Sequence, residues 1–398
     1  MRIGMLLDKP FPPDPRVGNE MRSLHRAGHD VHLLCPSVED GRPLSEDWQG
    51  IHVHRIRMSK KFFKRASALV LRVPFYWNAY ERPLRELAER ERFEAIHVHD
   101  LPLLRVGLRV GRALGVPVVS DLHENYPAAV ATYDYANRWP GRWLISVDQW
   151  RRYERRAVPA ADRVIVVVPE AMDRFQGLVP PERMVPISNT VDVDEFEGFP
   201  RDDSIEERFG SRFTIGYLGG FDRHRGLDTL VDGFAQVADE IPEAHLLLVG
   251  AGATKGPLEA DVRARGLADR VSFEGWQDYR LFPSYVRACK VCTIPHRKSE
   301  HTDTTIPHKL FHYMLLERPV LASNCLPIAR ILEETEAGLV HASGDAAGVA
   351  AALRTLRDGE LRARLGARGR EAVLGRYNWD RTAETLIEIY ATLQQNRT

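Results

Sequence analysis

Two segments in the second half of the chain bring basic side chains together with glycines and hydroxyls. In FTIGYLGGFDRHRGLDTL a strand pattern ends at Gly219 and Gly220, and Arg223 and Arg225 precede a helix expected to begin near Leu227. Glycines allow a phosphate to approach the backbone, and a guanidinium offers paired N–H donors and keeps its charge. This pattern indicates phosphate binding, although a solvated turn before an ordinary helix would share it.

The second segment, HTDTTIPHKLFHYMLLERPVLAS, adds another cation. Thr304 and Thr305 precede Pro307, a residue suited to a first helical turn, and Lys309 follows within that expected turn. A diphosphate held by Arg225 and Lys309 would be stabilised as negative charge developed on it. The two segments together therefore predict a clamp for a nucleotide diphosphate.

The elements that position these segments alternate between short β-branched runs and amphipathic stretches, which is typical of parallel sheets covered by helices. The expected strands span residues 2–7, 30–35, 51–56, 95–100, 117–122 and 163–168, and then 213–219, 244–250, 271–275, 290–295, 319–323 and 338–341. This restart predicts two doubly wound Rossmann-like domains, in residues 1–192 and 193–375, with residues 376–398 forming a helix that packs across the interface onto the first domain. Ligands bind at the carboxyl ends of such strands, so we expect the site in the cleft between the halves.

Length and charge narrow the possible classes of protein. The 398 residues exceed one ordinary domain, and equal numbers of basic and acidic residues argue against a dedicated nucleic-acid binder. Basic residues exceed acidic ones by six in residues 1–190, and the remainder has the opposite excess. The two halves therefore have different electrostatic characters.

Most of the local basic excess lies in residues 48–80, which contain seven Lys or Arg, no Asp or Glu, and several aromatic side chains. This stretch is compatible with peripheral contact to anionic lipids and equally with a basic surface over a core. No run is long enough to span a bilayer, and charge and proline interrupt the start of the chain. We expect a cytoplasmic protein, associated with the membrane's inner face if it is associated at all.

Several further patterns resemble metal or redox sites. The pair Cys289 and Cys292 lacks a second cysteine pair, so buried structural thiols are favoured. His97 and His99 share one strand face, but no third ligand lies at useful spacing, which favours structural or cleft-lining roles. We therefore expect no metal site.

An ordered set of motifs along nearly the whole chain resembles the retaining, metal-independent glycosyltransferases of family 4, which have the GT-B fold and include a glycogen-synthase and mannosyltransferase-like group. The segments that carry the resemblance are DKPFPPDPRVGNEMRSLHRAGHDVHLLC, AIHVHD, DLHENYP, ERRAVPAADRVIVVVPE, ISNTVDVDEF, GYLGGFDRHRGLDTLVDGFA, LVGAG, VSFEGW and PHKLFHYMLLERPVLAS. The resemblance implies a hexosyltransferase that moves a sugar from a nucleotide-diphosphate donor to a hydroxyl acceptor. It implies same-face attack, in which the leaving phosphate helps to deprotonate the acceptor, and no metal or other cofactor.

The resemblance also implies roles for individual residues. His123, Arg225 and Lys309 would be the catalytic residues, with His123 meeting the transferred sugar. Donor-binding positions would be Gly219, Gly220, Arg225, Trp276, Thr304, Thr305, Lys309 and His312. Acceptor-side positions would be Arg16, Asp121 and Glu124.

Two departures from the family pattern affect these roles. Thr304 and His312 stand where many members have a pair of glutamates that hold the sugar and the ribose, with Glu300 as a nearby substitute. The loop after the first strand lacks the usual Gly-Gly turn, so Arg16 would supply its positive charge.

Because of these departures, three readings of the chain remain open. The first is a transferase that acts in glycan, glycolipid or polysaccharide biosynthesis, with UDP-N-acetylhexosamine or GDP-mannose as donor and an acceptor that is lipid-linked or anionic. The second is a catalytically idle nucleotide or glycan-binding protein of the same fold, and the third is a sugar-nucleotide epimerase.

Overall fold

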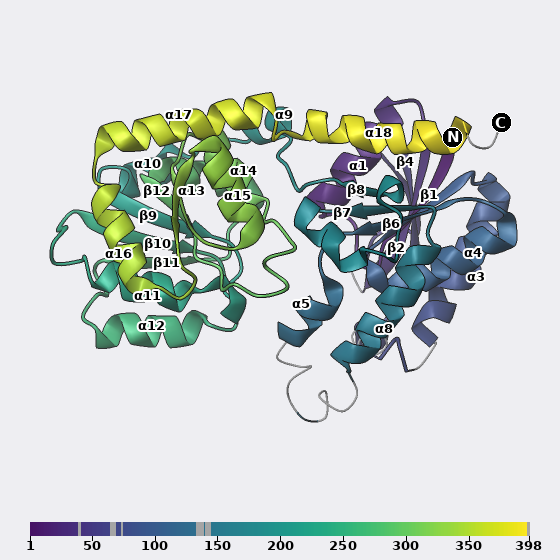
Figure 1. Ribbon diagram of the computed structural model, residues 1–398, viewed down its shortest axis with the longest axis horizontal. Coiled ribbons are helices and arrows are strands. Elements are labelled where there is room, and N and C mark those ends of the chain that lie inside the picture. Colours follow the sequence, from purple (N-terminus) through teal and green to yellow (C-terminus); the bar gives the residue numbers. More distant parts are fainter. Residues whose placement is uncertain (39–40, 64–68, 73–74, 133–138, 140–144, 396–398) are drawn as a thin grey trace. The chain divides into compact units, whose positions relative to one another are not determined.

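The computed structural model describes residues 1–38, 41–63, 69–72, 75–132, 139 and 145–395 (Figure 1). Contacts group these residues into two units, Met1–Ser188 with Thr382–Thr398, and Asn189–Arg381. The sequence boundary was expected at 192/193, and the chain passes between units at 188/189 and again at 381/382.

Unit 1 contains one eight-stranded sheet in the order β3-β4-β2-β1-β5-β6-β7-β8. Its strands are β1 (Arg2–Leu6), β2 (Asp30–Val38), β3 (Ser45–Trp48), β4 (Ile51–Met58), β5 (Ala95–His99), β6 (Val118–Leu122), β7 (Arg163–Val166) and β8 (Met184–Pro186). Every neighbouring pair is parallel except β3 with β4. Helices α1 (Pro15–Arg26), α3 (Phe75–Glu91), α4 (Leu104–Leu114), α5 (Tyr126–Thr132) and α8 (Val147–Ala157) connect the strands, and most of α18 (Trp379–Gln395) also belongs to this unit.

Unit 2 contains a six-stranded parallel sheet in the order β11-β10-β9-β12-β13-β14. Its strands are β9 (Phe213–Leu218), β10 (Ala244–Val249), β11 (Val271–Gly275), β12 (Val291–Ile294), β13 (Val320–Ser323) and β14 (Gly338–His341). Its helices are α9 (Val193–Glu197), α10 (Asp203–Phe209), α11 (Leu227–Ala235), α12 (Lys255–Ala264), α13 (Phe282–Ala288), α14 (Lys309–Leu315), α15 (Leu326–Thr335), α16 (Ala346–Thr355) and α17 (Gly359–Gly375). Helices lie on both faces of this sheet (Figure 1), which confirms a doubly wound architecture.

The twelve expected strands are all present, and most of them are buried β-branched or leucine-rich runs. Two strands were missed. Strand β3 is a charged antiparallel edge strand and β8 is a three-residue edge strand that ends in proline, so neither has the pattern of a buried strand. Helix α14 begins at Lys309, later than the turn expected around Pro307.

The basic stretch 48–80 is only partly exposed, and Lys64 and Arg65 lie outside the described residues. Arg55 is buried and bonds to the carbonyls of Pro43 and Phe11, while Tyr76, Trp77 and Tyr80 face the core. These three aromatic residues of α3 therefore pack in the core of unit 1. The exposed Lys, Arg and Phe side chains among the described residues of the stretch are Arg57, Lys60, Lys61, Phe62, Arg72 and Phe75.

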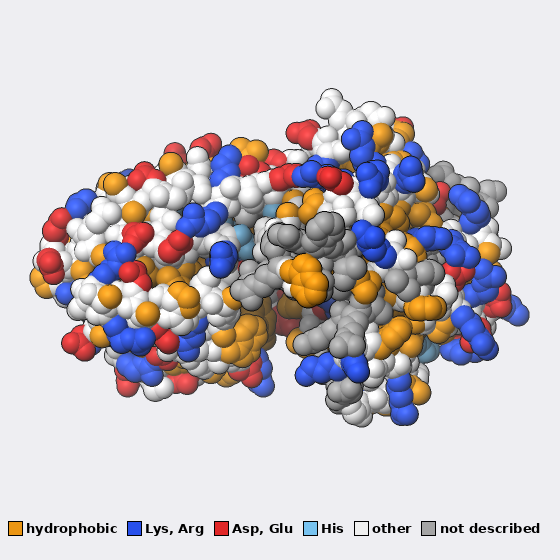
Figure 2. All heavy atoms as spheres, turned by 90° about the horizontal axis from the view of Figure 1, so that it is seen from below, with side chains coloured by type: hydrophobic (Ala, Val, Ile, Leu, Met, Phe, Trp, Pro, Cys, Tyr) orange, Lys and Arg blue, Asp and Glu red, His pale blue; other side chains and the backbone are white. Residues whose placement is uncertain are grey.

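Figure 2 shows many Lys and Arg side chains on one face of unit 1, interspersed with hydrophobic ones. Within the described part of the chain, no helix is long and apolar enough to cross a membrane. All four cysteines are buried and none forms a disulfide, as expected for structural thiols.

Candidate functional sites

The first candidate site, in unit 2, centres on a buried lysine. Lys309, the first residue of α14, is only 9% exposed, and its Nζ lies 3.9 Å from the ring centroid of Tyr217. No described hydrogen-bond acceptor or carboxylate meets this ammonium. Burial, and then the nearby Arg225, hold the pKa of Lys309 well below its usual value. A buried amine without a counter-ion is costly, so the site favours an anionic ligand.

More basic side chains surround Lys309. Arg225 ends a short 3₁₀ turn, Arg223–Arg225, before α11, and its Nη1 lies 3.2 Å from Nε2 of His296, which directly follows Pro295 after β12. Burial and then Arg225 hold the pKa of His296 well below its usual value. Burial, followed by Arg225, His301 and Lys309, lowers the pKa of His224 to about 3.

We call His224, Arg225, His296, His301 and Lys309 the basic cluster. Among the described residues, neither Lys309 nor Arg225 pairs with a carboxylate. Two cations that no described carboxylate neutralises, placed beside imidazoles, form an arrangement that binds phosphate oxygens.

Glycines keep the backbone beside this cluster open. A Cβ on Gly219, whose φ is +138°, would lie 2.5 Å from Nζ of Lys309. A Cβ on Gly250 would lie 1.9 Å from the carbonyl oxygen of Gly219. Only glycine at both positions preserves the close packing of these strand ends and the space around the ammonium.

A cavity of about 170 Å³ adjoins the cluster through Gly219. Its lining includes Gly219, Gly250, Trp276, Tyr279, Phe282 and Tyr285. Trp276 follows β11 directly and is 77% exposed, so its ring is available to a ligand. An aromatic cavity beside a cationic cluster suits a planar base joined to a phosphate chain.

The other expected donor residues occupy different settings. His312 is buried, stacks on Phe196 with ring centroids 4.3 Å apart, and lies with Nε2 3.1 Å from the Tyr279 hydroxyl. The structure thus places His312 behind Tyr279, which lines the cavity. Thr304 Oγ1 donates to the carbonyl of Glu300, whose side chain is exposed.

Two further donor positions complete the set. Thr305 is partly exposed in the segment before α14. Gly220 follows Gly219, and its carbonyl accepts a hydrogen bond from the Tyr217 hydroxyl.

The second candidate site, in unit 1, contains the expected acceptor-side residues. Arg16 is buried in α1 and pairs with Asp121 (Nη2 to Oδ1, 2.8 Å) and with Glu20 (Nε to Oε1, 3.0 Å). Burial opposes the charge of Asp121, but Arg16 and then His123 hold the pKa of that carboxyl well below its usual range. The sequence suggested that Arg16 supplies positive charge to the loop after the first strand. In the structure, Arg16 instead lies in α1 and pairs with two buried carboxylates.

His123 follows β6 and faces two carboxylates. Its Nε2 lies 2.9 Å from Oδ2 of Asp121, and its Nδ1 lies 3.6 Å from Oδ2 of Asp100, which also pairs with Lys9. Burial lowers the pKa of His123, but Asp100 and Asp121 outweigh it and raise the pKa to about 9. Burial raises the pKa of Glu124, next in the chain, to about 7.

Sequence reasoning missed several residues of both sites. His296, Lys9 and Asp100 each follow closely on the end of a parallel strand, a position that could have identified them. Glu20 and Tyr390 reach unit 1's site from helices far apart in the chain, and no local pattern marks them.

Comparison with known proteins gives consistent results for the two units. Residues 13–190 match the family model described as a glycosyl transferase 4-like domain, and residues 212–358 match the model of glycosyl transferases group 1.

Two relatives align along nearly the whole chain. The chain is 24% identical to a phosphatidyl-myo-inositol mannosyltransferase of Mycolicibacterium smegmatis, over 99% of this chain and 94% of that protein. It is 23% identical to an N-acetyl-alpha-D-glucosaminyl L-malate synthase of Bacillus anthracis, over 95% of this chain and 92% of that protein.

Solved structures show the same fold. The sucrose-phosphate synthase of Thermosynechococcus elongatus aligns with a TM-score of 0.81 at 20% identity, covering 99% of both chains. HepE of Anabaena, solved in complex with UDP-glucose, aligns with a TM-score of 0.71 at 16% identity, covering 98% of this chain and all of that one. The two family models together span most of the chain, and the solved structures show the same fold. The protein therefore belongs to the family 4 glycosyltransferases of GT-B fold.

Proposed function

We propose that this glycosyltransferase takes a sugar from a nucleotide-diphosphate donor bound on unit 2 and transfers it to a hydroxyl acceptor with retention at the anomeric carbon. The observation that carries the donor assignment is the buried Lys309, which has no acidic partner among the described residues and lies one glycine away from an aromatic cavity. A nucleotide diphosphate supplies both the base that fits the cavity and the anion that the cluster lacks.

In this proposal each part of the donor has a place. The base enters the cavity against Trp276 and Tyr279, and His312 orients Tyr279 through its hydroxyl. Gly219 and Gly220 border the diphosphate, and Arg225 and Lys309 neutralise it. As the bond between the sugar and the diphosphate breaks, negative charge grows on the phosphate oxygens, and these two cations stabilise that charge. Because protein cations do this work, donor binding and transfer need no metal.

Retention follows from same-face attack. The bond from the anomeric carbon to the leaving phosphate oxygen breaks, the bond to the acceptor oxygen forms on the same face, and the acceptor proton passes to the leaving phosphate. This route needs no side-chain nucleophile. The family resemblance assigns His123 to the transferred sugar, and the hydrogen bond to Asp121 fixes the orientation of its ring.

The acceptor proposal rests on the basic surface of unit 1 and on the named relatives, some of which act on phosphatidyl-myo-inositol. We propose a lipid-linked or anionic acceptor and peripheral contact with anionic membrane through the exposed residues among 57–75. UDP- and GDP-sugars are the donors to test first, with UDP-N-acetylhexosamine and GDP-mannose at the head of the panel.

A thermal-shift panel of UDP, GDP, dTDP and their sugars tests the donor. A ligand at one hundred times its dissociation constant adds about 2.7 kcal/mol of stability, which is a clear shift in melting temperature. The donor that gives the largest shift is then incubated with candidate acceptors, and NMR of the product reads the anomeric configuration. Equal, negligible shifts for every nucleotide would contradict the donor assignment, and inversion would contradict the mechanism.

The same panel separates the two other readings of the chain. An idle binding protein would show a shift with no release of nucleoside diphosphate over a long incubation. An epimerase would convert the sugar nucleotide into another sugar nucleotide with no acceptor present. The departures at Thr304 and His312 make the first of these controls necessary.

A further inference from the structure

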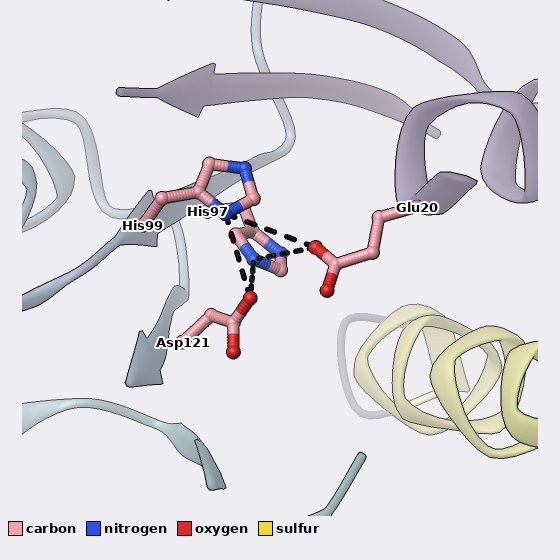
Figure 3. Close-up of side chains that lie close together, drawn as sticks. All are labelled: Glu20, His97, His99 and Asp121. Carbon is pink, nitrogen blue, oxygen red and sulfur yellow. Dashed lines mark ion pairs between the residues drawn. The ribbon is translucent and has the colours of Figure 1, made fainter. Parts of the chain in front are cut away.

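Four buried side chains in unit 1 converge on one point without completing a hydrogen-bond network. Glu20 comes from α1, His97 and His99 from β5, and Asp121 from β6, and all four are 0% exposed. Figure 3 shows Nε2 of His97, Nδ1 of His99 and one oxygen of each carboxylate turned toward a common centre. His97 and His99 share this face because side chains alternate along a strand.

Four of the six distances between these atoms are close to the edge length of a small tetrahedron, and the remaining two are within 4.8 Å. Nε2 of His97 lies 3.6 Å from Oε2 of Glu20 and 3.5 Å from Oδ2 of Asp121. Nδ1 of His99 lies 3.7 Å and 3.4 Å from the same two oxygens. A tetrahedral zinc ion with ligands at about 2.0–2.2 Å holds neighbouring ligand atoms about 3.3–3.6 Å apart. Direct hydrogen bonds would bring such atoms to about 2.7–3.2 Å.

Several of these atoms have no other partner. His97 Nε2 and Glu20 Oε2 are buried without a hydrogen bond among the described residues, whereas Glu20 Oε1 forms an ion pair with Arg16. Buried polar groups are normally satisfied, and an unsatisfied group that faces other ligand atoms indicates a missing partner. A cation at the centre would satisfy all of these groups at once.

The surrounding contacts orient the four ligand atoms. Tyr390 of α18 lies with its hydroxyl 2.7 Å from Nδ1 of His97, which leaves Nε2 of that ring for the centre. Arg16 pairs with Oε1 of Glu20 and Oδ1 of Asp121, and its Nε also donates to Oδ2 of Asp121 at 3.4 Å. Oε2 of Glu20 and Oδ2 of Asp121 face the histidines. His123 borders the site, with Nε2 2.9 Å from Asp121 Oδ2 and 3.1 Å from His99 Nδ1. Metal-binding histidines and carboxylates are typically fixed by such outer contacts.

We propose that unit 1 binds one divalent transition-metal ion, zinc in the first instance, through Glu20 Oε2, His97 Nε2, His99 Nδ1 and Asp121 Oδ2. Two nitrogens and two oxygens in a tetrahedral set suit zinc rather than calcium or magnesium, which prefer six or more oxygens. The four ligands are complete without water, so the ion is structural. It ties α1, β5 and β6 together behind His123, on the unit that does not hold the donor.

This site corrects the expectation that His97 and His99 lack further ligands. The missing ligands come from residues 20 and 121, which the parallel sheet and α1 bring to the strand ends. Metal-independent transfer is unaffected, because the donor diphosphate is assigned to protein cations on unit 2.

The test measures metal content directly. The full chain is unfolded in guanidinium with a chelator, refolded with or without Zn²⁺, dialysed, and analysed by mass spectrometry for bound metal. We expect one zinc per chain, retained through dialysis, and a higher melting temperature than for protein refolded without metal. Refolding with Co²⁺ should give the intense visible bands of a tetrahedral cobalt site.

Matched variants locate the ion. Glu20→Gln and His97→Asn keep the approximate size of each side chain, and each should lose most of the bound zinc and the cobalt bands. His52→Ala is the control, because His52 belongs to a second, half-exposed group with Asp30 and His32. Loss of zinc in His52→Ala with retention in Glu20→Gln would overturn the proposal. The proposal would also be overturned if the wild-type protein refolded to its native circular-dichroism spectrum with excess Zn²⁺ but retained no zinc. This result remains decisive if the variants fail to fold.

Discussion

The two units each contain a cluster of histidines at the ends of parallel strands, but the charges around them are opposite. In unit 1, His97 and His99 face Glu20 and Asp121, so the cluster presents paired carboxylates to the imidazoles. In unit 2, His224 and His296 face Arg225 and Lys309, and no described carboxylate pairs with either cation. We propose that the first arrangement suits a cation and the second an anion.

The difference teaches that the neighbours of a histidine decide what it can bind. Burial lowers the pKa of His99 to about 3 and that of His224 to about 3, so both rings are neutral at physiological pH. A neutral imidazole can ligate a metal together with carboxylates, and beside cations it can offer an N–H to a phosphate.

The largest effect is expected from removing a cation of the basic cluster. Lys309→Ala and Arg225→Ala should each lower kcat by about 10²–10³, because they remove charge that stabilises the leaving diphosphate. Steady-state kinetics with the donor found in the nucleotide panel measures the loss. Arg223→Ala serves as the control for loss of a basic residue in the same segment, and near-normal turnover of both cluster variants would refute the clamp.

A smaller effect is expected from closing the space next to Lys309. Gly219→Ala forces a methyl group against the ammonium at a φ that side chains rarely adopt, which should destabilise unit 2 by about 1–3 kcal/mol and weaken donor binding. Gly256→Ala, in α12 with open space around its Cα, is the matched control and should be neutral or slightly stabilising. Urea unfolding compares the two, and equal stability of both variants would contradict the tight packing.

The pH dependence of donor affinity tests the part that Lys309 plays in the basic cluster. The pKa of free Lys309 is lowered by burial and by Arg225, and a bound diphosphate would raise it again. At pH values between the pKa of Lys309 in the free protein and its pKa in the diphosphate complex, binding therefore takes up a proton. In this range the affinity for the donor falls as pH rises, by at most tenfold per pH unit.

Calorimetry in two buffers of different ionisation enthalpy, above about pH 7.5 where the nucleotide is fully ionised, measures this proton uptake. The variant Lys309→Met should bind without it. Proton uptake that persists in Lys309→Met would assign the titration to another group.

The smallest effect concerns the aromatic cavity. Trp276→Ala removes an exposed ring that stacks on the base, which should weaken nucleotide affinity by about 1 kcal/mol, or roughly fivefold. The same change should leave the affinity for inorganic pyrophosphate unaltered, because that ligand has no base. Equal losses for the two ligands would show that the substitution disturbs the phosphate cluster instead.

The comparison also shows which parts of the site can be predicted from sequence. Arg225 and Lys309 were predicted to act together because each lies within a local pattern of glycines, hydroxyls and an expected helix start, and the structure places them in one cluster. The twelve expected strands were found because each is a short apolar run between polar segments. Strand β3, by contrast, has the sequence Ser-Glu-Asp-Trp at the edge of the sheet, where pairing with β4 and not burial determines its conformation.

The unit 1 cluster was missed because its members come from distant parts of the chain. His97 and His99 were visible as a pair on one strand face, but Glu20 lies on α1 and Tyr390 on α18. Arg16 was expected to be a free loop cation, since the sequence does not show that α1 turns it toward Asp121. Contacts that depend on tertiary packing of this kind have no local signature.

The most direct test of the central claim is a calorimetric comparison of a nucleoside with its diphosphate. Uridine with UDP, and guanosine with GDP, are titrated into the wild-type chain and into Arg225→Ala and Lys309→Ala. We predict that the preferred diphosphate binds at least about tenfold more tightly than its nucleoside, which corresponds to about 1.4 kcal/mol, and that each variant abolishes this advantage while nucleoside binding stays unchanged. A diphosphate advantage that survives in both variants would contradict the assignment of the basic cluster as the donor phosphate site.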